Sequence, residues 1–209
     1  MISLFLDTTT SRLIVGIYKD KVELYFDNSE AHNDLSSRVL PKIKEALESV
    51  SLTVNDIDDI YVVNGPGSFT GIRVGVTIAK TLAWSIKKPI YTVSELAVIA
   101  SGSKTRYTIP LIDARRGYVY AGIYNKNLKS QIDDQYILLE DLKKLVKKEY
   151  KKEDISFVSY DKLEGVEKPI IDIEKLLSKV KVEEVNPHLV NPNYLKKTEA
   201  EEKLNDKNA

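Results

Sequence analysis

The strongest constraint on the fold of this chain is a short pattern that occurs twice, 106 residues apart. In the first copy Asp7 stands nine residues before a GIY tripeptide at 16–18. In the second copy Asp113 stands nine residues before a GIY tripeptide at 122–124. In both copies an apolar pair ending in Asp is followed by a short polar turn and a second apolar run. The pattern predicts a duplicated core whose two halves open with equivalent β-hairpins.

The residues around the repeat are typical of an α/β fold. The runs ISLFLDT, RLIVGIYK and KVELYFD indicate strands, and DIDDIYVVN indicates another. Residues 35–50 have apolar side chains at helical spacing, and Pro41 inside them predicts either a kink or a later helix start. Residues 69–86 form a helix that is apolar almost all round, which predicts burial on several sides. The polar stretch SGSKTR divides the chain into domains 1–104 and 105–209, the second ending in a polar tail.

A glycine-rich loop, NGPGSFTGIRVG, lies between the strand DIDDIYVVN and the apolar helix. It lacks the Lys-Ser/Thr pair of a Walker A loop and the third glycine of the dinucleotide-binding pattern. Ser68 and Thr70 at the helix N-terminus could still offer an anion site. The alternative is structural: Gly71 and Gly75 stand one turn apart and would let a second backbone approach the helix. Composition favours packing over phosphate binding.

Asp7 and Thr8 belong to the motif LDTTTS at the end of the first strand. An acidic side chain beside hydroxyl groups can hold a cation or contact phosphate oxygens. It can equally form a hairpin turn capped by its own side chains. Asp113, the repeat partner of Asp7, leaves the same two alternatives open. Facing carboxylates at the bottom of a two-domain cleft would suit a nucleotide.

Composition excludes several classes of site. The 31 basic and 31 acidic side chains balance, which argues against a strong basic field for nucleic acid but leaves a local patch open. The absence of cysteine excludes disulfides, thiolate zinc sites and a cysteine nucleophile. His32 and His188 have no companion at ligand spacing, so no metal site is expected. No apolar stretch approaches the roughly 20 residues of a membrane span. With a first strand at the N-terminus, we expect a cytoplasmic protein without a signal peptide.

Five motifs together resemble the bacterial TsaB (YeaZ) family along nearly the whole chain. They are LDTTTS, AHNDLSSRVLP, NGPGSFTGIRVGVTIAKTLA, LIDARRGYVYAGIY and NPNYLKK. The resemblance implies two duplicated ribonuclease H-like halves of the actin, Hsp70 and sugar kinase superfamily, the second reduced. The family usually has an arginine after the leucine of NPNYL. Lys196 stands there and retains the charge without the bidentate fork.

The resemblance also implies a role in forming N6-threonylcarbamoyladenosine (t6A) at position 37 of tRNA. Such a chain is a non-catalytic subunit that activates the transferase TsaD, acts with the ATPase TsaE and also pairs with itself. It meets tRNA only within the complex and has no cofactor of its own, although ATP or ADP could sit at the boundary with TsaD. At the positions of the metal ligands of TsaD this chain has Glu95 and Ile99, and an isoleucine cannot bind a metal.

In this family the helix after the glycine loop and the helix beginning near residue 35 form the surface that pairs with TsaD or with a second copy. Some of the apolar and small side chains on these helices must face the chain's own sheet instead. The residues we assign to the pairing surface are Leu35, Val39, Ile43, Gly71, Val74, Gly75, Ile78 and Leu82.

Two other functions remain as alternatives. An ATP-dependent small-molecule kinase or ATPase of the same superfamily would need an adenosine-binding glycine motif in the second half. After residue 122 the chain has only one further glycine, Gly165. A protease would need a zinc site or an activated nucleophile, and neither has a signature here.

Overall fold

A computed structural model describes residues 1–31, 34–180 and 184–196. His32 and the polar tail at 197–209 lie outside the described residues. The strands are β1 (Ile2–Asp7), β2 (Arg12–Lys19), β3 (Val22–Glu30), β4 (Asp59–Val63), β5 (Ile90–Val93), β6 (Tyr107–Asp113), β7 (Tyr118–Asn125), β8 (Ser130–Leu138), β9 (Ile155–Val158) and β10 (Glu184–Val185). The helices are α1 (Leu35–Ser49), α2 (Phe69–Ile86), α3 (Glu95–Ala100), α4 (Leu139–Glu149) and α5 (Ile173–Lys179), with short 3₁₀ turns η1 (Val54–Asp56), η2 (Lys152–Asp154) and η3 (Pro187–Leu189).

The two sheets confirm the duplication predicted from the repeat. The first sheet has the order β10-β5-β4-β1-β2-β3 and the second β8-β7-β6-β9. The second sheet therefore repeats the block β3-β2-β1-β4, with β6 to β9 in the places of β1 to β4. In both, the first three strands are antiparallel and the fourth pairs parallel to the first. The second half is the reduced one, because within the described ranges its sheet has no counterpart of β5. The boundary near residue 104 stays a prediction.

The repeated glycine and tyrosine have the same structural role in both hairpins. Gly16 and Tyr18 lie on one face of β2, and a side chain at Gly16 would collide with the Tyr18 ring. On β7 a side chain at Gly122 would collide with Asp134 Oδ1 and also crowd the Tyr124 ring. Both tyrosines are buried in the core that joins the two halves. The repeat thus marks equivalent positions where a large ring lies flat over its own strand.

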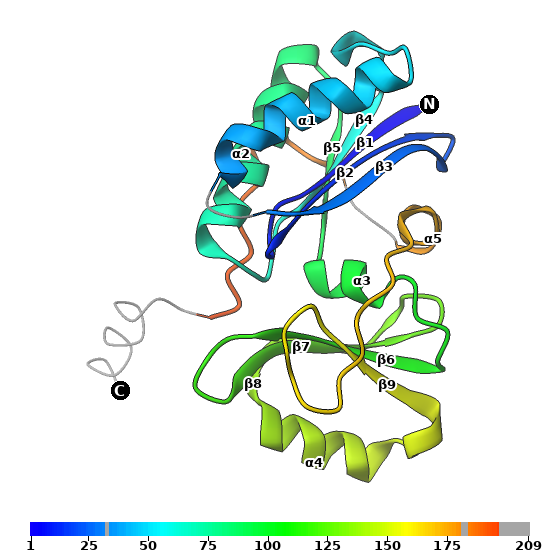
Figure 1. The fold of residues 1–209 in the computed structure, drawn as a ribbon, viewed down its shortest axis with the longest axis vertical. Coiled ribbons are helices and arrows are strands. Elements are labelled where there is room, and N and C mark those ends of the chain that lie inside the picture. The colour runs from blue at the N-terminus through cyan, green and yellow to red at the C-terminus, as the bar shows by residue number, and fades with distance from the viewer. Residues whose placement is uncertain (32–33, 181–183, 197–209) are drawn as a thin grey trace, which may run out of the picture.

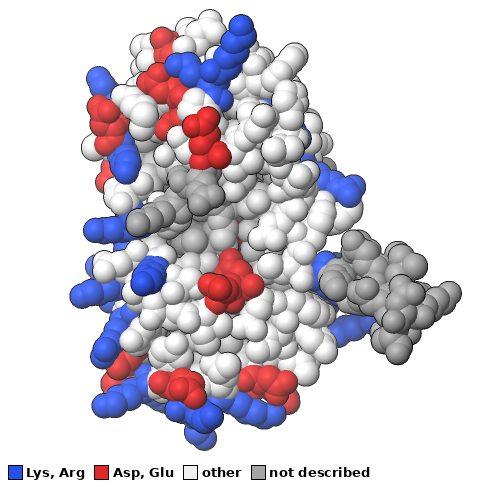
Figure 2. Space-filling model, turned by 180° about the vertical axis from the view of Figure 1, so that it is seen from behind, with Lys and Arg blue, Asp and Glu red and all other residues white. Residues whose placement is uncertain are grey.

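Three cores hold the molecule together. One lies between the first sheet and helices α1 and α2, one surrounds α3 and α5 between the two sheets, and one lies between the second sheet and α4. Figure 1 shows this stacking, with α1 and α2 at one end, α3 in the middle and α4 at the other end. Seen from behind, Lys and Arg side chains gather along one edge and at the α4 end (Figure 2).

Helix α1 begins at Leu35 and contains Pro41, so the expectation of a later start is wrong. Pro41 is exposed, where the loss of one backbone hydrogen bond is compensated by solvent. None of the helices in the described part of the chain is both long and apolar enough to cross a membrane.

Candidate functional site

The LDTTTS turn packs directly against the first turns of α2. The Thr8 hydroxyl donates to the Gly71 carbonyl at 2.7 Å, and both residues are buried. A Cβ at Gly71 would collide with the Thr8 carbonyl oxygen, and one at Gly75 would collide with the Thr8 hydroxyl. The two glycines therefore admit this chain's own turn. This corrects the assignment of Gly71 and Gly75 to a partner surface, since no room is left beside them.

Gly65 has a different reason to be glycine. Its φ of +123° suits only a residue without a side chain, and it turns the chain from β4 toward α2. A Cβ there would also meet the carbonyl oxygen of Asn193. The Asn193 amide donates to the Asn64 carbonyl at 2.7 Å, so the NPNY motif is fastened to the glycine loop.

Asp7 faces another carboxyl group in the interior. Asp7 and Glu95, the first residue of α3, are both completely buried. Asp7 Oδ1 accepts hydrogen bonds of 2.7 Å from the Thr9 amide and from the Thr9 hydroxyl. Asp7 Oδ2 and both Glu95 oxygens have no donor among the described residues. A hydrogen bond between the two carboxyl groups therefore requires that one of them carry a proton.

Burial is the main cause of the altered acidity of this pair. It raises the pKa of Asp7. Burial, followed by the neighbouring Asp7 charge, holds the pKa of Glu95 well above its ordinary value. Glu95 is therefore the group that keeps the proton. The pair joins the end of β1 to the start of α3 and is closed to a solvent-borne ligand.

A cleft of about 550 Å³ opens between the two halves next to this turn. Ser68 and Thr70 line one wall and Asp113 lines the other. These three predicted contacts do come together, whereas Asp7 and Thr8 lie buried behind the cleft. Sequence reasoning missed several other lining residues. The polar run after β1 and the ARRG turn were signals for Thr9, Thr10, Ser11 and Arg115, and no pattern marked Tyr120, Tyr160 and Asp161.

The polar groups of the cleft are partly used by the fold itself. The Ser68 hydroxyl caps α2 by accepting from the Gly71 amide at 3.3 Å. Asp113 Oδ1 accepts from the Arg115 amide at 2.8 Å, and Asp161 Oδ2 accepts from the Asp113 amide at 2.7 Å. Ile99 lines the cleft floor. Among the described residues no group of three or more His, Cys, Asp or Glu side chains could hold a metal ion.

The side chains that α1 and α2 expose to solvent differ from those that we expected. Val39 and Ile43 are buried against the chain's own sheet, so their assignment to the pairing surface is wrong. They share a stripe of α1 that packs inward, whereas Leu40, one position after Val39, is 55% exposed. The remaining predicted residues lie half-buried at the border of this core: Leu35, Val74, Ile78 and Leu82.

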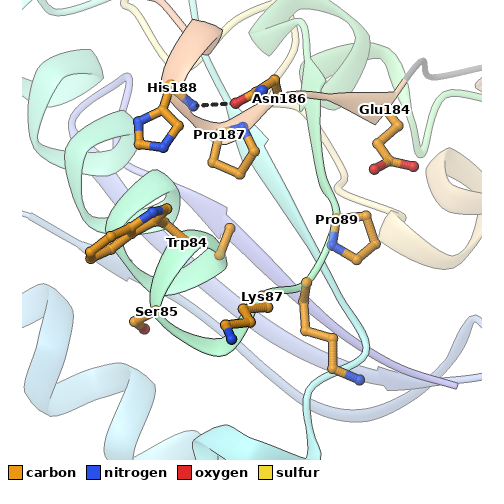
Figure 3. Close-up of a pocket in the computed structure, with 10 residues that line it drawn as sticks. Trp84, Ser85, Lys87, Pro89, Glu184, Asn186, Pro187 and His188 are labelled. Carbon is orange, nitrogen blue, oxygen red and sulfur yellow. Dashed lines mark hydrogen bonds between the residues drawn. The ribbon is translucent and has the colours of Figure 1, made fainter.

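Trp84 is the largest exposed side chain of α2. Its indole is 61% exposed and meets the His188 ring edge-on, with 6.2 Å between the ring centroids. Figure 3 shows Trp84 projecting from the last turn of α2 beside η3, where Pro187 and His188 form the other side of a groove. The groove has a volume of about 510 Å³. Sequence reasoning missed Trp84 because a helix that is apolar almost all round has no pattern that marks its outward side.

Comparisons with known proteins agree with this architecture. The family described as "TsaD: tRNA N6-adenosine threonylcarbamoyltransferase" matches residues 29–169. The tRNA threonylcarbamoyladenosine biosynthesis protein TsaB of Bacillus subtilis is 33% identical over 166 residues, covering 77% of this chain and 72% of that protein. TsaB of Escherichia coli is 33% identical over 130 residues, covering 59% of this chain and 55% of that protein.

Solved structures show the same fold. YeaZ from Pseudomonas aeruginosa superposes with a TM-score of 0.75 at 20% identity, covering 93% of this chain and 99% of that one. A second crystal structure from that organism, of a protein described as similar to the peptidase YeaZ, gives a TM-score of 0.78 at 21% identity with the same coverage. The sequence relationship together with the fold shows that this chain belongs to the TsaB (YeaZ) family.

Proposed function

We propose that this chain is a non-catalytic scaffold and activator in t6A formation at position 37 of tRNA, and that it binds the transferase TsaD. Relatives in several bacteria carry the name tRNA threonylcarbamoyladenosine biosynthesis protein TsaB, which supports the tRNA-modification role over an ATP-dependent kinase. Binding would use the outer helical face, which we define as the exposed Leu40, Pro41, Thr77, Thr81 and Trp84 with the half-buried Val74, Ile78 and Leu82.

The observation that carries the proposal is the lack of charge on this face of α2. Between Arg73 and Lys87 the helix has one charged residue, Lys80. Its ammonium group is already used by the fold, since it donates to the carbonyl oxygens of His188 and Val190 at 3.4 and 3.2 Å. The centres of protein interfaces are depleted of charged residues and enriched in tryptophan. A helix face of this composition on a chain with 30% charged residues favours a protein partner.

Trp84 is the expected anchor of that contact. A tryptophan side chain buries about 150–250 Å² and is among the commonest interface hot spots. Its ring is held by η3 and therefore loses little freedom on binding.

The proposal extends to the other members of the complex. In the absence of TsaD the same face pairs with a second copy of the chain, and TsaE acts alongside the pair. ATP or ADP would bind at the boundary with TsaD, with the wall of the cleft that carries Ser68 and Thr70 turned toward it. All of these steps belong in the cytoplasm, where tRNA is modified.

The test is reconstitution of t6A formation with TsaD, TsaE and the adenylate-forming enzyme, with modified adenosine measured by mass spectrometry. Wild-type chain is expected to be required, and Trp84→Ala or Thr81→Arg to lower both TsaD capture and modification at least tenfold. Gln131→Arg, an exposed position on β8, is the matched control and should behave as wild type. Modification that proceeds equally without this chain would contradict the proposal.

A further inference from the structure

An aromatic and cationic cluster stands beside the cleft at the first turn of α2. The Arg73 guanidinium lies 3.7 Å from the centroid of the Phe69 ring, and its Nε donates to the Tyr194 hydroxyl at 2.9 Å. The rings of Phe69 and Tyr194 stack at 5.1 Å between centroids. Phe69 is 48% exposed and Tyr194 39%. A cation is thus fixed against two rings that each keep a substantial exposed surface.

A second cluster of the same kind lies on the second sheet. Tyr118 and Tyr136 are stacked with 4.6 Å between centroids and 6° between ring planes. Tyr120 extends this group, with its centroid 5.7 Å from that of Tyr136. The Lys196 ammonium lies 5.4 Å from the Tyr136 ring centroid. All three rings are half-exposed.

Two arginines complete the second side. Arg115 and Arg116 form the turn between β6 and β7, both in the left-handed region with φ of +67° and +54°, and both are exposed. Within residues 1–31, 34–180 and 184–196, no ion pair involves Arg73, Arg115 or Arg116. Their charges are therefore available to an anionic partner.

The two clusters border one cleft. Phe69 lines its first wall, and Arg115 and Tyr120 line the second. The carboxylates of this wall, Asp113 and Asp161, each accept a backbone amide hydrogen bond, which offsets part of their charge. We name the set Phe69, Arg73, Arg115, Arg116, Tyr118, Tyr120, Tyr136, Tyr194 and Lys196 the cleft rim.

We propose that the cleft rim binds single-stranded RNA, and specifically the tRNA loop that carries the modified adenosine. This inference rests on the proposed function and names where the chain meets its RNA. Planar rings beside fixed cations are the chemistry that recognises unpaired bases and phosphates together. Arg115 and Arg116 hold phosphates, and the exposed rings stack bases. Because the chain has no net charge, this local group supplies the attraction that the whole molecule lacks.

An acidic segment of a partner protein is the competing occupant. It would use the arginines and leave the exposed rings without a role. The tyrosine stack provides a flat platform of two parallel planes, which matches bases better than carboxylate side chains.

The test measures binding of a fluorescent anticodon stem-loop RNA to the complex assembled with TsaD. The variant is Arg115→Asn/Arg116→Asn, because asparagine tolerates the left-handed backbone of both positions. We expect the dissociation constant to rise about tenfold and the slope of log K against log salt to flatten by about 0.7 per lost contact. Lys143→Gln/Lys147→Gln, which removes two exposed charges from α4, is the matched control and should change neither.

A second variant separates stacking from charge. Phe69→Ala should weaken RNA binding about tenfold while leaving the salt slope unchanged, because a stacked base contributes no counterion release. Unchanged RNA affinity in both variants overturns the inference. Weakened capture of TsaD or TsaE with unchanged RNA affinity also overturns it and assigns the rim to a protein partner. If the wild-type chain fails to assemble with TsaD, the proposed function fails, and the same titration on the chain alone decides the cleft rim independently.

Discussion

The hydroxyl of Thr8 donates a 2.7 Å hydrogen bond to the carbonyl oxygen of Gly71, although 63 positions separate the two residues in the chain. The contact joins the turn after β1 to the first turns of α2, on which both the cleft and the outer helical face depend. It exists because Gly71 and Gly75 leave a groove on the helix into which one threonine fits. The two glycines therefore serve a packing contact inside the first half of the chain, between the turn after β1 and α2.

Gly75→Ala should lower the free energy of unfolding by about 1–2 kcal/mol. The added methyl group collides with the Thr8 hydroxyl, and this overpacking exceeds the gain in helix propensity of about 1 kcal/mol. Urea unfolding measures the difference. Thr77→Ala, at an exposed position of the same helix, should stay within about 0.5 kcal/mol of wild type. Equal stabilities of Gly75→Ala and wild type would show that the contact between Thr8 and α2 can accommodate a methyl group without cost.

The Asp7–Glu95 pair should make stability fall as the pH rises. Burial raises the pKa of Glu95 far above its ordinary value of 4.5, so the folded chain keeps a proton that the unfolded chain releases. The free energy of unfolding therefore begins to fall above about pH 4.5 and keeps falling until Glu95 ionises in the folded chain. For one proton this fall is at most about 1.4 kcal/mol per pH unit.

Glu95→Gln should flatten this slope, since an amide donates to Asp7 without titrating. Urea unfolding from pH 5 to 9 compares it with Glu48→Gln at an exposed position on α1, which should retain the wild-type slope. If Glu95→Gln has the same pH dependence of unfolding free energy as wild type, the proton on Glu95 does not cause that dependence.

The two repeat tyrosines should respond oppositely to loss of their hydroxyl groups. The Tyr124 hydroxyl donates to Asp134 Oδ1 at 2.5 Å, and Asp134 also accepts from Ser94 across the two halves. Tyr124→Phe should therefore cost about 1–2 kcal/mol. The buried Tyr18 hydroxyl has no partner among the described residues, so Tyr18→Phe should be neutral or slightly stabilising. Equal losses in chemical unfolding would contradict this difference.

Local pattern was enough to predict strands β1 to β4, helices α1 and α2 and the duplication, because each depends on residue spacing within a short window. The small-residue stripe of α2 showed that something approaches Gly71 and Gly75. It did not show whether that neighbour was Thr8 or another protein. The pairing of Asp7 with Glu95 was equally hidden, since it depends on which strands become neighbours in the sheet rather than on spacing.

The cleft was predicted in part. Ser68, Thr70 and Asp113 lie on its walls because strand ends and helix starts gather at one edge of each sheet. Asp7 and Thr8 lie in the same motif yet are buried. In this motif a residue that lines the cleft stands only one or two positions from a residue that is buried. The sequence alone does not show which of them faces the cleft.

Neighbouring residues of α1 should distinguish the inward face from the outward one. Val39→Asp places an unpaired carboxylate in the core against the first sheet and should cost roughly 3–5 kcal/mol, enough to unfold the chain or nearly so. Leu40→Asp, one position along, puts the same charge on the outer helical face. The chain should stay folded by circular dichroism and lose TsaD capture. Full capture by folded Leu40→Asp would exclude α1 from the pairing surface, because a charge at the centre of a contact cannot be buried without cost.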